Sequence, residues 1–317
     1  MTERPLPPRF PDFIIGGAPK CGTSSLHGIL AQHDAIGMPE AEIHYFDADD
    51  PITHPDFLDV RGGALHWYDT AAVDNLDWYA RQFAPFRDAP CVGEDSTTYL
   101  FSEAAPERIK AFLPDVKLIF MLRDPVKRAY SQYWHLACSA RMNCGFEQGL
   151  LNHTSMVLGS TYAPHLRRYF DVFGRDRVRV ILFEDFLGGM QGTMDGVTDY
   201  LGVPAMDLST ARTWFNQTRY PTHPRAHQAL NRVGAYFVTR RYRNHMEARS
   251  DPWAQLQRKL HDRWFRHVNP TFLKADKPPP MRDDTRAYLA QHLSARNAGL
   301  SDLLGRDLSQ VWPGFTG

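Results

Sequence analysis

The sequence predicts an α/β fold in which helices flank a central parallel sheet in three layers, followed by a helical C-terminal third. An apolar run at 13–15 leads through a glycine-rich loop into a helical pattern at 23–33, and this order of elements is typical of a phosphate-binding unit. Residues 116–122 are apolar almost throughout, as a buried parallel strand would be. Strands then alternate with helices as far as residue 183, which favours a parallel sheet.

The remaining elements follow from proline positions and apolar spacing. Residues 1–12 are proline-rich and predict an extended lead-in, whereas 34–90 predict an irregular insertion rich in Asp, His and aromatic residues. We see no internal repeat and no domain boundary, so we expect a single domain over 1–317. The expected later elements are helices at 125–138 and 164–173, a strand at 178–183, and helices near 226–243, 252–267 and 283–304.

Composition limits the function. The 317 residues carry no formal net charge, which argues against nucleic acid or an anionic membrane as a partner. The four cysteines form no CxxC pair, so neither a disulfide framework nor a zinc site is expected and a reducing compartment fits. There is no secretory signal and no apolar run of roughly 20 residues, the length of a membrane helix. We therefore expect a soluble, cytoplasmic protein.

The loop after the first strand has the spacing of a phosphate loop, with Gly17 and Gly22 separated by four residues. In a nucleoside-triphosphate loop, lysine directly follows the second glycine, and the next Ser or Thr binds magnesium. Here Lys20 lies inside the loop, and no strand ends in an Asp suited to Mg²⁺, so no metal is expected. Backbone N–H groups and the helix start can still hold a phosphate; a plain glycine turn is the alternative. The residues expected at the phosphate are Lys20, Cys21, Gly22, Thr23, Ser24 and Ser25.

A second anion site is suggested by Arg123, directly after the strand at 116–122, and by Ser131 on the following helix. Ligands of open α/β sheets bind beyond the carboxyl ends of the strands, and an Arg fork suits a phosphate. Taken alone, however, an Arg in this place is more often a surface or ion-paired residue. Two phosphate sites on neighbouring units would suit a nucleotide that is phosphorylated at both ends.

The pairing of APKCGTSSL with LIFMLRDPVKRAYSQYWH resembles the sulfotransferases that use 3′-phosphoadenosine 5′-phosphosulfate (PAPS). The resemblance implies that Lys20 and residues 22–25 hold the 5′-phosphosulfate, and that Arg123 and Ser131 hold the 3′-phosphate. It also implies a P-loop-like fold. The pattern is similar to heparan-sulfate-type members but looks like a soluble bacterial-type member, and Asp95 stands where many glycan-sulfating relatives carry lysine.

The stretch EIHYFD at 42–47 resembles the segment that carries the catalytic glutamate in the heparan-sulfate-type branch. We expect Glu42 to act as the base, since burial among aromatic residues would raise the pKa of a glutamate, with His44 as a further candidate. A packed edge with a solvated Glu is the alternative. The polar loop at 216–225 resembles the family's late loop over the cofactor, where Arg219 or Arg225 would meet the 3′-phosphate, although an ordinary solvated loop has the same composition.

The function expected is sulfuryl transfer from PAPS to a hydroxyl or amine of a glycan, lipid or natural product. Lys20 would stabilise the charge that grows on the departing phosphate. Two alternatives stay open at this point: a P-loop kinase, which a magnesium requirement would favour, and a nucleotide-binding module without catalysis. The presence of both Lys20 and a candidate base favours the enzyme.

Overall fold

The computed structural model describes residues 9–55, 57–67, 69, 73–213, 219–242, 256, 259–260 and 263–317. Two compact units are distinguished by their internal contacts, and each alternates with the other along the sequence. The first comprises Met1–Asp47, Asp69–Arg123 and His165–Phe215. The second comprises Ala48–Tyr68, Asp124–Pro164 and Asn216–Gly317.

The first unit contains a five-stranded sheet in the order β2-β5-β1-β6-β7, and all its strand pairs are parallel. Strand β1 lies in the middle and is buried along its whole length. Because the chain leaves β1 for one side of the sheet and later crosses to the other, the loop after β1 lies where such sheets bind ligands. The strands are β1 (Phe13–Gly17), β2 (Ile36–Gly37), β5 (Cys91–Asp95), β6 (Lys117–Leu122) and β7 (Val178–Leu182).

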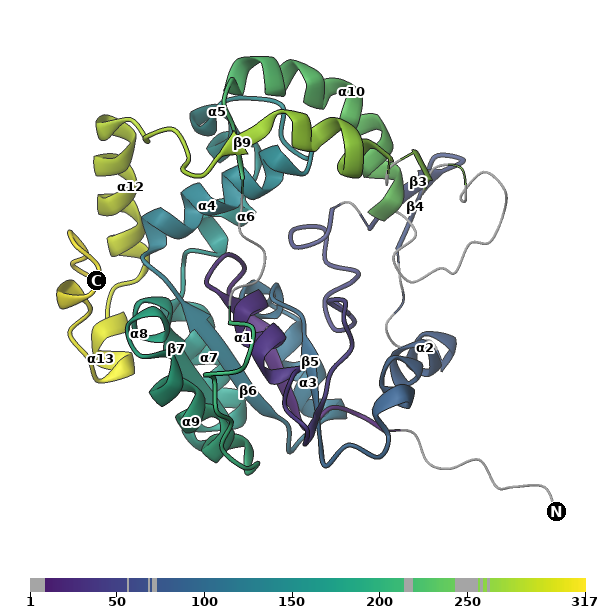
Figure 1. Ribbon diagram of the computed structural model, residues 1–317, viewed down its shortest axis with the longest axis vertical. Coiled ribbons are helices and arrows are strands. Elements are labelled where there is room, and N and C mark those ends of the chain that lie inside the picture. The colour runs from purple at the N-terminus through teal and green to yellow at the C-terminus, as the bar shows by residue number, and fades with distance from the viewer. Residues whose placement is uncertain are drawn as a thin grey trace. The chain divides into compact units, whose positions relative to one another are not determined.

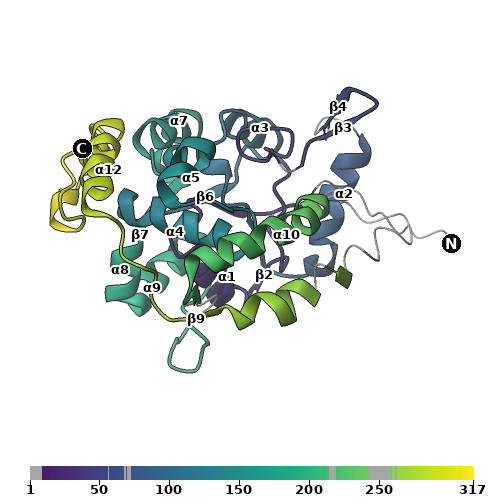
Figure 2. The ribbon, with the colours of Figure 1, turned by 90° about the horizontal axis from the view of Figure 1, so that it is seen from above.

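Helices cover both faces of this sheet, with α3 and α7 on one face and α1 and α9 on the other (Figure 2). The Phe120 ring of β6 packs against Tyr169 of α7 at 4.6 Å, and the Tyr200 hydroxyl of α9 donates to the Leu118 carbonyl at 3.3 Å. The predicted three-layer parallel α/β fold is therefore confirmed. The helices are α1 (Thr23–Leu30), α2 (Val73–Phe83), α3 (Ala105–Phe112), α7 (Ala163–Phe173), α8 (Phe183–Gly188) and α9 (Met190–Leu201), with 3₁₀ turns at Ala84–Phe86, Tyr99–Phe101 and Arg175–Arg177.

Two parts of this unit differ from the expectation. The insertion at 34–90 is not irregular throughout, because α2 forms in it and buries Tyr79 and Phe83. Strand β5 was not predicted, since a glycine and two acids within five residues give it low strand propensity. Its position between β2 and β1 supplies hydrogen-bonding neighbours on both sides, and this tertiary context outweighs propensity.

The second unit is mainly helical, and the predicted helical C-terminal third is confirmed over its described residues (Figure 1). Helix α4 begins where predicted because Asp124 caps it, accepting the N–H groups of Val126 and Lys127 at 2.9 and 3.1 Å, and because proline suits the first helical position. The helix predicted near 252–267 falls largely outside the described residues. The elements are α4 (Pro125–Cys138), α5 (Phe146–Asn152), α6 (Ser155–Leu158), α10 (Pro224–Tyr242), α12 (Asp283–Arg296) and α13 (Leu300–Leu304), a π-helical turn at Trp264–Val268, 3₁₀ turns at Asn269–Thr271 and Leu308–Gln310, and antiparallel pairs β3 (Asp59–Arg61) with β4 (Ala64–His66) and β8 (Tyr220–Pro221) with β9 (Leu273–Ala275).

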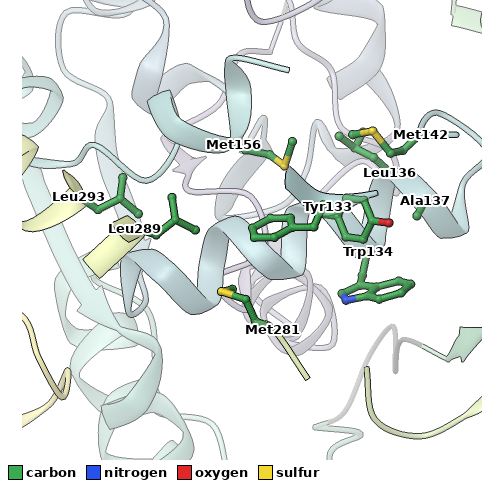
Figure 3. Packing of buried hydrophobic residues seen from close by; sticks show 10 residues of the cluster. Tyr133, Trp134, Leu136, Ala137, Met142, Met156, Met281, Leu289 and Leu293 are labelled. Carbon is green, nitrogen blue, oxygen red and sulfur yellow. The ribbon is translucent and has the colours of Figure 1, made fainter. Parts of the chain in front are cut away.

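The core of the second unit gathers around α4 (Figure 3). Side chains of α4, α5, α6 and α12 meet there, and α12 contributes residues more than 150 positions further along the chain. No helix in the described parts of the chain has both the length and the apolar character needed to cross a membrane. The buried members are Tyr133, Trp134, Leu136, Ala137, Met142, Phe146, Met156, Met281, Leu289 and Leu293.

Candidate active site

The loop between β1 and α1 turns sharply by means of three residues with positive φ. These are Gly17 (φ 138°), Lys20 (φ 70°) and Gly22 (φ 94°). The Ala18 N–H donates to the Met121 carbonyl of β6 at 2.9 Å, so the loop is tied to the neighbouring strand. A left-handed lysine is uncommon and strained, and it lies at the position that the sequence singled out.

Helix α1 starts at Thr23, directly after Gly22 of this loop, and no side chain among the described residues caps it. The first N–H groups of a helix have no partner within the helix, and together with the helix dipole they favour an anion. Ser24 is exposed at this helix start, Ser25 is partly exposed, and Thr23 and Cys21 are buried. The Ser24 and Ser25 side chains are therefore open to solvent, and the assignment of residues 20–25 to a phosphate stays a prediction.

Arg123 and the loop share one aromatic support, Phe183 at the start of α8. The Arg123 guanidinium lies 4.8 Å from the Phe183 ring centroid, in the range of a cation–π contact. A Cβ placed on Gly22 would lie 2.7 Å from the same ring, so glycine is needed for this approach. Arg123 also points Nη1 at the Lys20 carbonyl, 3.4 Å away. Arg123 and Gly22, one from each predicted anion motif, therefore both lie against the Phe183 ring. Phe183 was not among the residues predicted from the sequence.

Glu42 and His44, predicted separately, form a pair. Glu42 Oε2 lies 2.8 Å from His44 Nε2, and the carboxylate accepts this hydrogen bond because an ionised carboxylate has no proton to donate. The Glu42 side chain is 41% exposed and the His44 side chain 11%. Glu42 is therefore open to a substrate, and His44 lies behind it.

Residues after strand β5 hold this pair from the other side. The Thr97 hydroxyl donates to Glu42 Oε1 at 3.0 Å, and Thr98 Oγ1 lies 3.0 Å from His44 Nδ1. Both carboxylate oxygens of Glu42 and both nitrogens of His44 thus have fixed partners. Neither threonine was among the residues predicted from the sequence, and near them only Asp95 was singled out.

The charge around His44 favours its protonated form. Burial lowers the pKa of His44, but the hydrogen bond and negative charge of Glu42, with smaller contributions from Asp47 and Asp95, raise it above its ordinary value of 6.5. His44 therefore keeps its positive charge next to Glu42 to a higher pH than an ordinary imidazole does. Such a charge attracts the Glu42 carboxylate and holds it in place.

Asp95 ties helix α1 to the Glu42 segment. Its Oδ2 lies 3.2 Å from His27 Nδ1, and its backbone carbonyl accepts the Ile43 N–H at 3.3 Å. Burial raises the pKa of Asp95 to about 6, while His27 and His44 lower it. The Asp95 side chain thus occupies an internal position against α1.

The other predicted residues lie in the second unit. Ser131 is on α4 with a partly exposed side chain, and Arg225 is exposed in the first turn of α10. Arg219 forms an exposed ion pair with Asp276 at 3.4 Å. Their assignment to a 3′-phosphate stays a prediction, and 214–218 of the late loop fall outside the described residues.

The fold and its loop define a class, the P-loop-like α/β proteins in which an anion is held between a central strand and its following helix. A family model described as "Sulfotransferase family" matches residues 11–207, more than half of the chain. The chain therefore belongs to the sulfotransferase family, as its motifs predicted.

Individual relatives agree with this membership. The chain is 27% identical over 220 residues to human heparan sulfate glucosamine 3-O-sulfotransferase 3B1, covering 67% of this chain and 50% of the relative. It is 26% identical over 217 residues to human bifunctional heparan sulfate N-deacetylase/N-sulfotransferase 2, covering 62% of this chain and 22% of that protein. The chain thus spans half or less of these two relatives. A solved sulfotransferase from Alicyclobacillus acidocaldarius is 26% identical, with a TM-score of 0.61, covering 95% of this chain and 98% of that one.

Proposed function

We propose that the protein transfers the sulfuryl group of PAPS to a hydroxyl or amine of a glycan, lipid or natural-product acceptor. Lys20 and the start of α1 bind the phosphosulfate, Arg123 binds the 3′-phosphate together with Ser131, and Glu42 is the base. Membership of the sulfotransferase family supports the reaction class. Two relatives are named for heparan sulfate, which favours a glycan among the three acceptor classes.

One observation carries this proposal: the anion loop and the candidate base meet at Thr97. The Thr97 hydroxyl donates to Glu42, and a Cβ on Gly17 would lie 2.4 Å from the Thr97 carbonyl oxygen. Next to it, the Ser96 N–H donates to the Ile15 carbonyl of β1 at 3.0 Å. Group transfer requires that the base and the site of the leaving group be held in a fixed geometry. Here Glu42 and the loop after β1 are both held by the segment that follows β5.

The residues present fit a nucleotide with phosphates. The uncapped start of α1 supplies N–H donors, Gly22 leaves no side chain over them, and Lys20 adds a point charge within the loop. The sulfuryl donor supplies a good leaving group, a phosphate, when it is bound. Lys20 and the helix start would stabilise the negative charge that grows there, which a cation within the loop does without a metal.

On the acceptor side, Glu42 removes the proton of the attacking hydroxyl or amine. Its exposed carboxylate is held at both oxygens by His44 and Thr97, so its orientation is set before a substrate arrives. As the proton reaches Glu42, the pair with His44 loses its charge attraction. Glu42, whose side chain is 41% exposed, then releases this proton to solvent, which restores the carboxylate and its pair with His44.

Calorimetry with adenosine 3′,5′-bisphosphate, AMP and ATP in EDTA tests the donor site, followed by transfer of label from ³⁵S-labelled PAPS to a panel of acceptors. We expect the bisphosphate to bind more tightly than AMP or ATP, without a metal, and transfer to an acceptor of one class. Equal affinity for AMP and the bisphosphate would contradict the 3′-phosphate site. Turnover of ATP that requires magnesium would instead favour a kinase, and binding without any transfer a non-catalytic module.

A further inference from the structure

Behind the Glu42–His44 pair lies a fully buried carboxylate, Glu94, on strand β5. Its side chain is 0% exposed, and it receives three hydrogen bonds of 2.7 Å, from the hydroxyls of Tyr79, Tyr99 and Ser96. Burial raises the pKa of Glu94, and these donors lower it. A buried carboxylate destabilises a fold unless it is hydrogen-bonded. The three hydroxyl donors offset that cost at Glu94.

Ser96 links Glu94 to His44 by two hydrogen bonds, one that it donates and one that it accepts. A serine hydroxyl has one hydrogen, and Ser96 donates it to Glu94 Oε1. The Ser96 oxygen is therefore free to accept, and it accepts the backbone N–H of His44 at 2.8 Å. Glu94 thus orients the Ser96 hydroxyl, and Ser96 in turn binds the backbone of His44.

The backbone at His44 needs such support. Its φ is 53°, in the left-handed region, which is strained for a residue other than glycine. In this conformation the His44 imidazole lies between Glu42 Oε2 at 2.8 Å and Thr98 Oγ1 at 3.0 Å. Without an acceptor for its N–H, the segment would relax towards a more favourable φ and move the imidazole.

We propose that Ser96, oriented by the buried carboxylate of Glu94, is a positioning residue that holds the left-handed backbone of His44 and thereby sets the geometry of the Glu42–His44 pair. This role rests on the proposed function for its effect on turnover. Its effect on the geometry of His44 stands independently of any reaction.

The test compares Ser96→Ala with Tyr79→Phe. Each removes one hydrogen bond of 2.7 Å to Glu94, but only the first breaks the link to His44, so Tyr79→Phe is a matched control for the loss of stability. The pKa of His44 is followed by NMR of ¹³C-labelled histidine, assigned with His44→Gln, in the full chain. Turnover and bisphosphate affinity are measured on the same samples.

In Ser96→Ala we expect the pKa of His44 to fall towards its ordinary 6.5, because the imidazole moves away from Glu42. We also expect kcat to fall about 10- to 100-fold, the cost of a small misplacement, with bisphosphate affinity unchanged. Tyr79→Phe should keep the wild-type pKa of His44 and most of the turnover. The same pKa and kcat in both variants would overturn the positioning role.

The two proposals fail in different ways. If no acceptor is ever sulfated but the pKa of His44 falls only in Ser96→Ala, the proposed function fails and the positioning role stands. If transfer occurs and Ser96→Ala behaves like the control, the function stands and the positioning role is wrong.

Discussion

Replacing Asp95 by asparagine should make the protein more stable at pH 8 and leave its stability unchanged at pH 4. The Asp95 carboxyl is 5% exposed, and burial raises its pKa from 3.8 to about 6, against the opposing effect of His27. A raised pKa means that the fold favours the protonated acid. The stability contributed by this group is therefore fully present below pH 3.8 and is lost as the pH rises through about 6.

The size of the effect follows from the two pKa values. A shift from 3.8 to about 6 corresponds to a penalty of about 3 kcal/mol for the ionised form in the fold. Asparagine avoids this penalty, and its side-chain oxygen still accepts a hydrogen bond from His27. We expect Asp95→Asn to gain about 2–3 kcal/mol in free energy of unfolding at pH 8, with most of the gain appearing between pH 4 and 6.5.

Urea denaturation of both proteins at half-unit steps from pH 4 to pH 8 measures the difference, because groups that titrate alike in both proteins cancel. Asp34→Asn, at an exposed carboxylate, is the control and should change stability by less than about 0.5 kcal/mol. A difference between Asp95→Asn and wild type that is constant across this range would refute the reasoning, since it would mean that burial does not hold Asp95 in its acid form.

The remaining predictions concern the loop and the base. Glu42→Gln should lower kcat by about 10²–10⁴-fold and leave bisphosphate affinity near wild type by calorimetry; near-normal turnover would remove Glu42 from the base role. Lys20→Ala should lower both kcat and bisphosphate affinity, and an unchanged affinity would contradict its place at the phosphosulfate. Arg123→Ala should weaken bisphosphate binding by about 1.5–3 kcal/mol but AMP binding little, whereas equal losses would make the arginine structural. Gly17→Ala should lower the urea midpoint, because its Cβ would meet the Thr97 carbonyl at 2.4 Å with φ at 138°; a wild-type midpoint would show that the loop can yield there.

The parts of the fold that the sequence predicted carry local signals. The strand at 116–122 is apolar enough to be read alone, and the helix at 125–138 has a cap and a proline at its start. Strand β5 carries no such signal, since the glycine and two acids of CVGED give it low strand propensity. It becomes a strand because β1 and β2 lie on either side of it, and no window of sequence contains that information.

The candidate site divides in the same way. Lys20, Glu42 and His44 were identified by residue type and motif, but the contact between Glu42 and His44 depends on a left-handed backbone at His44. Alternation along an extended chain does not predict that conformation. Thr97 reaches Glu42 across 55 positions of sequence, so its role follows only from the pairing of β5 with β2.

The alternation of the two units along the chain has a consequence for synthesis on the ribosome. Every residue of the first unit has been made once position 215 is reached, whereas the second unit still lacks everything from 216 onward. Until α12 is made, the apolar surface of α4 lacks Leu289 and Leu293, which belong to the same buried cluster in the finished protein. At roughly 5–20 residues per second, synthesis of residues 216–317 takes on the order of five to twenty seconds. A nascent chain with such a surface is a natural client for a chaperone, and C-terminal truncations should yield aggregates rather than a soluble fragment.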